Sequence, residues 1–423
     1  MEKYFIKPEK FDKSKDLVFQ IIEWYSGDEF HDDTDTDNED DIDSKNILKA
    51  DYIINCFGVT TEGKSITCRI ENFKPFYYVR VPDTFTRANL KNFTDFVENS
   101  WMFRKFKKDC ESDEPLYVLA RNKGMCRCSL VERKDIYGFQ NNKKHKFVQL
   151  FFNNYACFSK SRYIFKSPIK IPGIDNKLHK YKLYESNFEP FMRFCHIKDI
   201  KMGGWAKITG GKYKIISDYA NTRLTVAIDR TVIERVDSNS IGNFLQMSYD
   251  IEVYSRDYSF PDPKIPDNVV YQIANVFKRQ NEKTRVKCLL SLKKVAPIES
   301  TSDLETVIVE EFENERALLK RWIKLVNKID PDIIYTYNGD SFDFMYIFER
   351  AKLCGLTYEL ETCLSRLREN PASIKHEVFS SSAYGDSDFD RVYIPGRLNY
   401  DLLIHFKRGM KKYSSYKLDF IAN

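Results

Sequence analysis

The stretch at residues 243–255, NFLQMSYDIEVYS, constrains the fold more than any other because it places two carboxylates inside an apolar strand pattern. Residues two apart along a strand face the same side, so Asp250 and Glu252 point one way and the apolar residues beside them point the other. Two acids on one face of a central strand cost free energy unless a cationic group meets them. A pair of divalent metal ions would meet them, with Asp250 placed to bridge both ions.

An edge strand that shows an acidic face to solvent is the alternative interpretation of the same pattern. The flanking residues Phe244, Leu245 and Met247 are apolar, which favours a strand that is buried and paired on both sides. The stretch therefore predicts a central strand with a metal-binding face.

The pattern around this strand predicts a mixed sheet with helices packed against it. Further strands are expected at residues 269–279, 286–294 and 332–338, and helices at residues 313–328 and 342–354. The carboxyl ends of strands in such sheets are where ligands and metals are commonly held.

A second polar motif, NGDSFD at residues 338–343, lies at the expected junction of a strand and a helix. Gly339 permits a tight backbone turn, and Asn338 can bond neighbouring backbone or substrate. Asp343 falls in the first turn of the helix, where a capping acid is very common. Together with the first motif, however, it supplies a third carboxylate about 90 residues downstream, as a two-metal phosphodiesterase requires.

The charge of the chain is uneven. Residues 28–43, DEFHDDTDTDNEDDID, carry ten carboxylates and no Lys or Arg, so a net charge of +5 leaves +15 on the rest of the chain. We expect residues 28–46 to form a disordered acidic insert, because like charges at this density repel one another. A body this basic suits a protein that binds a polyanion, although a merely soluble basic protein has the same charge.

The amino-terminal part is predicted to be strand-rich. Strands with turn signals are expected across residues 51–82, with TTEGK as a hairpin turn, and a helix is expected at residues 87–103. Basic and aromatic residues interleave in IYGFQNNKKHKFVQLFF at residues 136–152. The predicted domains are residues 1–237, which are strand-rich, and residues 238–423, which carry both acidic motifs.

The cysteines and the hydropathy pattern predict an intracellular protein. The ten cysteines are scattered, and the C-x-C pair Cys126 and Cys128 has no second pair at zinc-finger spacing, so we expect no zinc site. No stretch approaches the roughly 18 consecutive apolar residues of a membrane span, and the amino terminus has no secretory signal pattern.

Both acidic motifs resemble those of family B DNA polymerases. MSYDIEVYS resembles the first exonuclease motif of this family, and IDPDIIYTYNGDSFDFMYIFERAKLCG resembles the second. INCFGVTTEGKSITCRIENFKPFYYVRVP is similar to the amino-terminal barrel of the delta-like replicative branch, and VYIPGRLNYDLLIHFKRGMKKYSSYKLDFIAN to the region that follows the second motif. The resemblance implies a barrel-containing domain followed by a ribonuclease H-like exonuclease domain, with a mixed sheet flanked by helices.

The resemblance also implies a function: hydrolysis of the terminal phosphodiester at a single-stranded 3′ end of DNA, as in proofreading. Asp250 would hold two Mg²⁺ or Mn²⁺ ions, Glu252 one of them, and Asp343 would complete the site. Phe342 would support the frayed end, and Asp401 is either a further acid of the cleft or a structural acid after a strand. The other residues expected to contact nucleic acid are Asn338, Lys143, Lys144, Lys407 and Arg408, although each of the basic ones has solvated surface as its alternative.

The chain departs from the family pattern in one respect. The third exonuclease motif, Tyr-x-x-x-Asp, is absent, because Tyr416 and Asp419 have the wrong spacing, and no polymerase palm motif follows. We therefore expect a carboxy-terminal polymerase polypeptide as a partner, at the nucleus or a viral replication site. The alternatives are a free-standing ribonuclease H-like nuclease and a non-catalytic module that binds nucleic acid.

Overall fold

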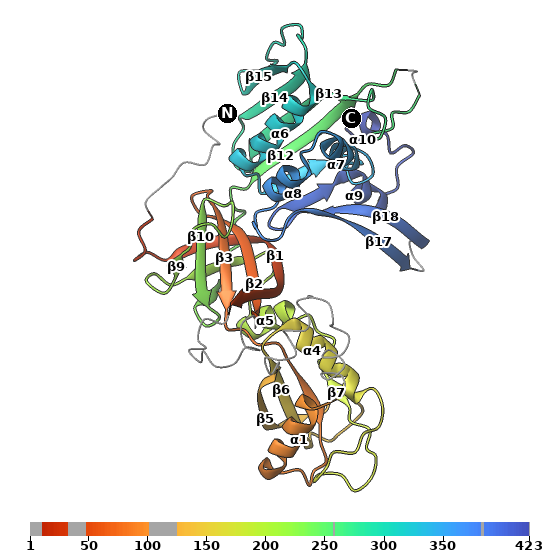
Figure 1. The fold of residues 1–423 in the computed structure, drawn as a ribbon. Coiled ribbons are helices and arrows are strands. Elements are labelled where there is room, and N and C mark those ends of the chain that lie inside the picture. The colour runs from red at the N-terminus through yellow and green to blue at the C-terminus, as the bar shows by residue number, and fades with distance from the viewer. Residues whose placement is uncertain (1–10, 33–47, 101–124, 257–258, 382–384, 423) are drawn as a thin grey trace, which may run out of the picture.

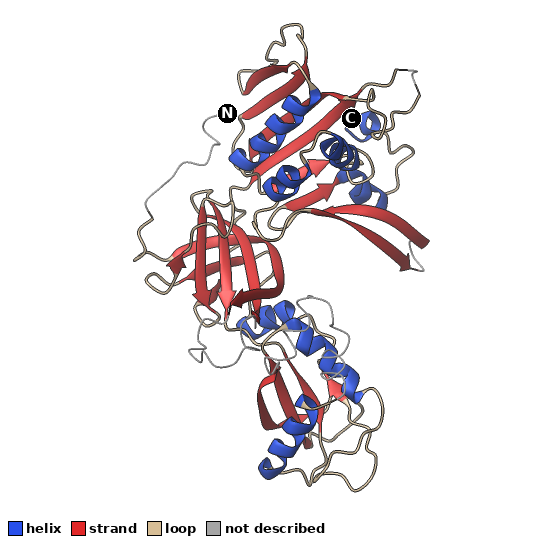
Figure 2. Cartoon of the chain, viewed as in Figure 1, coloured by secondary structure: helices blue, strands red, loops and turns tan. Residues whose placement is uncertain are grey.

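The computed structural model describes residues 11–32, 48–100, 125–256, 259–381 and 385–422. These residues form three main sheets, which follow one another along an elongated molecule (Figure 1). A curled seven-stranded sheet lies in the middle, a six-stranded sheet lies beyond one end of it, and a four-stranded sheet lies beyond the other. The predicted fold class is confirmed: strands dominate the amino-terminal part, and a mixed sheet with helices follows (Figure 2).

The curled sheet has the strand order β11-β8-β1-β2-β3-β10-β9. Its strands are β1 (Leu17–Asp32), β2 (Leu48–Thr60), β3 (Ser65–Glu71), β8 (Trp205–Ile208), β9 (Lys214–Ile215), β10 (Leu224–Asp229) and β11 (Ile233–Val236). The predicted TTEGK turn joins β2 to β3 as an antiparallel hairpin, in which Val59 pairs with Ser65. Alternate residues such as Ile54 and Val226 face a core to which helix α5 (Pro190–Lys198) adds Phe194.

The beginning of the acidic run is ordered, contrary to our expectation for residues 28–46. Strand β1 continues to Asp32, and each residue from Asp28 to Asp32 pairs with β2. The order has a physical cause, because the first two acids are bonded. The Asp28 carboxylate accepts hydrogen bonds from the backbone N–H groups of Tyr155 and Ala156, at 2.6 and 2.9 Å, and Glu29 accepts one from Arg69 at 3.0 Å. The rest of the expected insert, up to residue 46, lies outside the described residues.

The four-stranded sheet has the order β5-β6-β4-β7 and is antiparallel throughout. Its strands are β4 (Phe76–Arg80), β5 (Met125–Lys134), β6 (Lys144–Phe152) and β7 (Leu183–Tyr184). Helices α1 (Leu90–Glu98) and α4 (Tyr155–Ser161) pack against one face, where Phe93 and Phe158 join the core. Helix α1 is shorter than the predicted helix at residues 87–103, of which residues 87–89 form a 3₁₀ turn and residues 101–103 lie outside the described ranges.

The six-stranded sheet has the order β15-β14-β13-β12-β16-β19. Its strands are β12 (Leu245–Val253), β13 (Val270–Arg279), β14 (Arg285–Leu292), β15 (Glu305–Phe312), β16 (Ile333–Thr336) and β19 (Leu398–Asp401). The helices of this part are α6 (Glu315–Ile329), α7 (Asp343–Leu353), α8 (Thr357–Leu364), α9 (Leu402–Arg408) and α10 (Leu418–Ala422). A separate hairpin, β17 (Ser373–Ser381) with β18 (Gly385–Tyr393), projects beside them (Figure 1). Strand β15 and this hairpin were not predicted.

Helix α6 shows how the sequence positions this sheet. The Asn314 side chain caps its first turn by accepting from the backbone N–H of Ala317 at 2.9 Å. Leu318, Trp322 and Ile329 then recur at helical spacing and are buried against the sheet. The predicted helix at residues 313–328 is therefore confirmed, with a shift of one or two residues at its ends.

A buried group of charged side chains joins the segment before β16 to the segment after α8, to the turn before β19 and to the curled sheet. Arg366 and Arg397, both almost fully enclosed, converge on Asp330 at 2.8 and 2.6 Å. Arg366 also pairs with Asp332 at 2.7 Å. The hydroxyl of Ser65, at the start of β3 in the curled sheet, donates to Asp330. Because each charge has a partner of opposite sign, the group can be buried without the full desolvation cost.

Membrane-crossing helices and disulfides are both missing from the described ranges. No helix there combines the length and the apolar character needed to cross a bilayer. No disulfide joins the cysteines whose side chains the structure describes, and most of these are buried in the cores.

Candidate active site

Strand β12 lies inside its sheet, so the edge-strand alternative is wrong. It pairs with β13 on one side, antiparallel, and with β16 on the other, parallel. Along it, Met247, Tyr249 and Ile251 are buried, whereas Asp250 and Glu252 are exposed on the opposite face. The alternation predicted for the two carboxylates is therefore present.

The second motif reaches β12 because its strand ends early. β16 stops at Thr336, and the chain turns and begins helix α7 at Asp343. Strand β12 continues beyond that end, so the backbone N–H of Ile251 is left without a strand partner on this side. The Asp343 carboxylate accepts that N–H at 3.3 Å, which brings it beside Asp250. Two acids from separate motifs thus meet at one place.

The pair of carboxylates carries unneutralised negative charge. Burial, and next the negative charge of the adjacent Asp250 carboxylate, raise the pKa of Asp343 to about 7, against the opposing effect of the hydrogen bond from Ile251. Burial and the negative charges of Asp343, Asp340 and Asp250 also raise the pKa of the Tyr249 phenol. The Tyr249 hydroxyl is buried without a hydrogen-bond partner among the described residues. An added cation would relieve this repulsion, so the residues fit a divalent ion.

The Glu252 side chain does not join Asp250 and Asp343 in a three-residue group that could hold one metal ion. Within the described ranges, no three His, Cys, Asp or Glu side chains are arranged to hold a metal together. Glu252 occupies the next position on the exposed face of β12, one strand repeat beyond Asp250. The structure therefore brings Asp250 and Asp343 together and leaves Glu252 beside them.

The turn before Asp343 is held by Asp401. The Asp401 carboxylate accepts the backbone N–H groups of Asn338 at 2.9 Å and Asp340 at 3.3 Å, and it also caps α9 through the N–H of Leu403 at 2.9 Å. These bonds give Asp401 a structural role at the turn, and its role in the nuclease cleft stays a prediction. Asn338 adopts the left-handed conformation, with φ of 67°, which asparagine tolerates better than most residues.

Gly339 is required by close approach rather than by an unusual backbone angle. A Cβ atom at this position would overlap the side chain of Thr336, at the end of β16. Its φ is not positive, and the left-handed residue of the turn is Asn338. A residue without a Cβ is needed at 339 because the turn folds back onto Thr336, at the end of its own strand.

Two aromatic residues lie beside the acidic pair. Phe342, just before Asp343, is half-buried, and its ring centroid is 5.6 Å from that of Tyr346 and 5.5 Å from that of Phe260. Phe260 is 81% exposed and was missed by the sequence analysis. The only signal for it was a phenylalanine in a proline-rich loop ten residues after Asp250.

The loop that carries Phe260 is anchored from below by α7. Arg350 donates to the carbonyls of Pro263, Ile265 and Pro266 at 2.8–3.1 Å and pairs with the buried Glu315. These bonds hold residues 263–266 in place, and the ring contact with Phe342 places Phe260 beside the residue that precedes Asp343.

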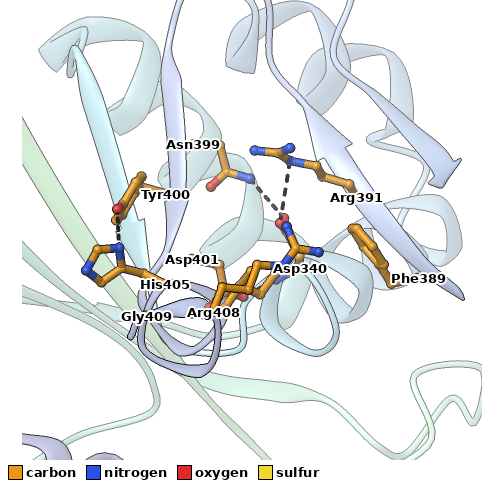
Figure 3. A pocket seen from close by; sticks show the side chains of 10 residues that line it. Asp340, Phe389, Arg391, Asn399, Tyr400, Asp401, His405, Arg408 and Gly409 are labelled. Carbon is orange, nitrogen blue, oxygen red and sulfur yellow. Dashed lines mark hydrogen bonds and ion pairs between the residues drawn. The ribbon is translucent and has the colours of Figure 1, made fainter. Parts of the chain in front are cut away.

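A cavity of about 370 Å³ adjoins the turn. Figure 3 shows Asp340 at its wall, joined to Asn399 at 2.9 Å and facing Arg391 at 4.0 Å. The other lining residues include Asp401 and Arg408, so the predicted contact residue Arg408 lies near the turn. Lys407 precedes it on the same exposed helix end.

Lys143 and Lys144 are not part of this site. Lys144 begins β6 in the four-stranded sheet and Lys143 directly precedes it, and this sheet lies on the far side of the curled sheet from β12 (Figure 1). Lys143 is exposed and pairs with Asp83 at 3.4 Å.

The chain is similar to known proteins along most of its length. Residues 181–421 match the family described as DNA polymerase family B, exonuclease domain. The chain is 28% identical to a DNA polymerase of Acanthamoeba polyphaga mimivirus and 29% identical to the DNA polymerase delta catalytic subunit of Arabidopsis thaliana. These matches cover 81% and 88% of this chain, but only 18% and 32% of those relatives, so the chain spans a third of their length or less.

A solved structure, that of the family B DNA polymerase from the archaeon Pyrobaculum calidifontis, has the same fold. It superposes with a TM-score of 0.55 over 96% of this chain and 39% of its own, at 16% sequence identity.

Proposed function

The chain belongs to DNA polymerase family B, whose exonuclease domain it contains, and from this premise we propose that it removes nucleotides from the 3′ end of single-stranded DNA. One observation carries the proposal: Asp343 at the start of α7 is bonded to β12 beside Asp250. The two motifs that the sequence separates by about 90 residues therefore supply one acidic centre.

We assign the metal-binding role to the acids of this centre. Exonuclease domains of this family generally use divalent metals. Asp250, Asp343 and Glu252 would hold two Mg²⁺ or Mn²⁺ ions, and the exposed face of β12 leaves the ions accessible to DNA. Bound ions supply Lewis acidity and a low-pKa water for phosphodiester hydrolysis.

The neighbouring residues of the chain orient the substrate. Phe342 and Phe260 offer ring faces on which the terminal bases can stack, because aromatic side chains bind unpaired bases in this way. Asn338 can bond the strand near the turn, and Lys407 and Arg408 face the phosphates from α9. Asp401 acts through the turn, which it fixes in place.

We propose that the whole function is replicative proofreading and that a carboxy-terminal polymerase polypeptide completes it. The support is that relatives named as DNA polymerases are three or more times as long as the matched part. The site of action would be the nucleus or a viral replication site. A non-catalytic module that binds nucleic acid is the alternative, favoured by the absence of a three-residue metal group within the described ranges.

A trimming assay tests the proposal. Single-stranded DNA labelled at its 5′ end is incubated with the chain, alone and with the carboxy-terminal polypeptide, in Mg²⁺, in Mn²⁺ or in EDTA. We expect stepwise shortening from the 3′ end that needs a metal and the partner polypeptide. Asp250→Ala should abolish it, whereas Asp303→Ala, at an exposed turn between β14 and β15, should not. Equal trimming by Asp250→Ala would show that the activity comes from elsewhere.

A further inference from the structure

The four-stranded sheet has a second face that its helices do not pack against. Helices α1 and α4 cover the side that carries Tyr77, Val79 and Leu150. Strand alternation places the neighbours Phe76 and Tyr78 on the opposite side, where both are only half-buried. This opposite side, named here the open face, holds the strand half of the basic and aromatic stretch at residues 136–152, which the nuclease proposal does not use.

Six aromatic rings form a continuous row across the open face. Each ring contacts the next at a centroid distance between 5.2 and 6.4 Å, in the order Phe151, Phe76, Tyr78, Phe147, Tyr184 and Tyr137. Phe147 and Tyr184 are buried and support the row, whereas the other four rings are accessible. Tyr137, at 62% exposed, ends the row in the loop between β5 and β6.

Arginines lie over these rings. The guanidinium of Arg127 is 4.4 Å from the centroid of Phe151, and that of Arg193 is 5.3 Å from the centroid of Phe76. Arg80 lies 6.0 Å from Phe147 and pairs with Asp135, and Arg193 pairs with Glu185. Among the described residues of β4, β5 and β6, none of the side chains on the open face is acidic, and the exposed Arg127 makes no ion pair.

The loop between β5 and β6 extends the same chemistry. Its backbone is fixed by Asp135, which accepts the N–H of Tyr137 at 3.0 Å and the hydroxyl of Tyr184 at 3.0 Å. Beyond Tyr137, Phe139 is 94% exposed, and Lys144 is exposed at the start of β6. Tyr137 and Phe139 thus add exposed aromatic surface next to the row, and contiguous exposed apolar surface is typical of a binding site.

We propose that the open face is a second binding site for single-stranded nucleic acid, separate from the nuclease site. Bases stack on Phe151, Tyr78 and Tyr137, with the half-buried Phe76 supporting the row between the first two, and the backbone phosphates follow Arg127 and Arg133. Stacking on sheet aromatics beside arginines is how proteins bind unpaired strands. The acids that reach the row, Asp135 and Glu185, are each paired with an arginine, which disfavours a basic protein surface as the partner. The curled sheet separates this face from β12 (Figure 1), so the two sites can engage different strands or distant parts of one strand.

Binding measurements on the full chain test the proposal. Fluorescence anisotropy is recorded with labelled twelve-nucleotide oligo-dT and oligo-U in EDTA, which prevents hydrolysis, over a range of salt. We expect Tyr137→Ala to weaken binding about tenfold, from the loss of one stacked base. Arg127→Glu should reduce the slope of log affinity against log salt by roughly 0.7, from the loss of one phosphate contact. The tighter of the two oligonucleotides identifies DNA or RNA as the natural source.

Matched controls and a mapping experiment make the result decisive. Tyr358→Ala, on the exposed side of α8, and Lys283→Glu, in the turn after β13, should leave both quantities unchanged. Cross-linking with bromouracil-substituted oligonucleotides should label peptides within residues 76–80, 127–133 or 137–151. Unchanged affinity in both test variants, or cross-links confined to residues 245–422, would overturn the proposal. Failure of the trimming assay leaves this result untouched, because no metal or hydrolysis enters it.

Discussion

A carboxyl group at the junction of two sheets should make the stability of this protein depend on pH. Glu23 lies in β1 beside the bulge at residues 21–23, and its carboxylate accepts the backbone N–H of Gly396 at 2.6 Å. Gly396 belongs to the turn before β19, so this bond joins the curled sheet to the six-stranded sheet. Burial raises the pKa of Glu23 from 4.5 to about 8, against the opposing effects of the Gly396 bond and of Arg366 and Arg391.

The sign of the effect follows from where the proton is held. Between pH 4.5 and about 8, the folded protein keeps the Glu23 proton and the unfolded chain loses it, so folding becomes less favourable as pH rises. Above pH 8 the cost is complete. A difference of three to four pKa units, at about 1.4 kcal/mol each, gives an upper bound of about 5 kcal/mol. Because part of the Glu23 residue reaches solvent, we expect about 3 kcal/mol.

The substitution Glu23→Gln isolates this effect, because glutamine keeps an acceptor for Gly396 and cannot ionise. Urea unfolding at pH 5 and pH 9 should show a gain over the parent of less than about 1 kcal/mol at pH 5 and about 3 kcal/mol at pH 9. Glu62→Gln, at an exposed carboxylate paired with Lys64, should show no such gain at high pH. An equal gain at both pH values, or a loss at pH 9, would refute the reasoning.

Three further substitutions test the candidate site and its supports. Asp343→Asn keeps an acceptor for the N–H of Ile251 but removes the charge. Because the pKa of Asp343 is about 7, its ionised form destabilises the fold at pH 8, so the substitution should raise the free energy of unfolding at pH 8 by about 2 kcal/mol while trimming falls at least a hundredfold. A lower free energy of unfolding in urea at pH 8 would contradict this. Arg350→Met leaves Glu315 buried without its partner and should cost about 3–5 kcal/mol in urea unfolding, and a cost below about 1 kcal/mol would show that the anchor is dispensable. Gly339→Ala drives a Cβ into Thr336 and should cost about 1–3 kcal/mol and slow trimming, and wild-type values for both would mean that the turn can move aside.

The sequence predicted those parts of the site that depend on spacing within one element. The exposed positions of Asp250 and Glu252 follow from the two-residue repeat of a strand, and that repeat was visible in the apolar residues around them. Asp343 could be placed at a helix start because Tyr346 and Ile347 follow it at helical spacing. The hairpin turn between β2 and β3 and the core face of α6 were predicted from equally local signals.

The errors arose where a residue depends on partners far along the chain. The acidic run was expected to repel itself, but Asp28 and Glu29 are held by groups at residues 155, 156 and 69. The bonds from Asp401 to the turn at residues 338–340 join positions 61 and 63 residues apart, which no local pattern indicates. Phe260 lies in a loop with no periodic pattern, and only its ring contact with Phe342 connects it to the site.

The same distinction predicts that sensitivity to substitution will not follow the recognisable motifs. Arg366 has no signal in the sequence, yet it pairs with both Asp330 and Asp332 in a dry interior. Arg366→Met would leave those acids partly unpaired, at a cost of more than about 3 kcal/mol. It should reduce trimming by lowering the fraction of folded protein, so trimming per folded molecule, with the folded fraction taken from circular dichroism, should stay close to the parent value. Asp250 is exposed on its strand, and its loss should leave folding intact and remove only the activity. Loss of trimming per folded molecule in Arg366→Met would instead make the buried charges part of the active site.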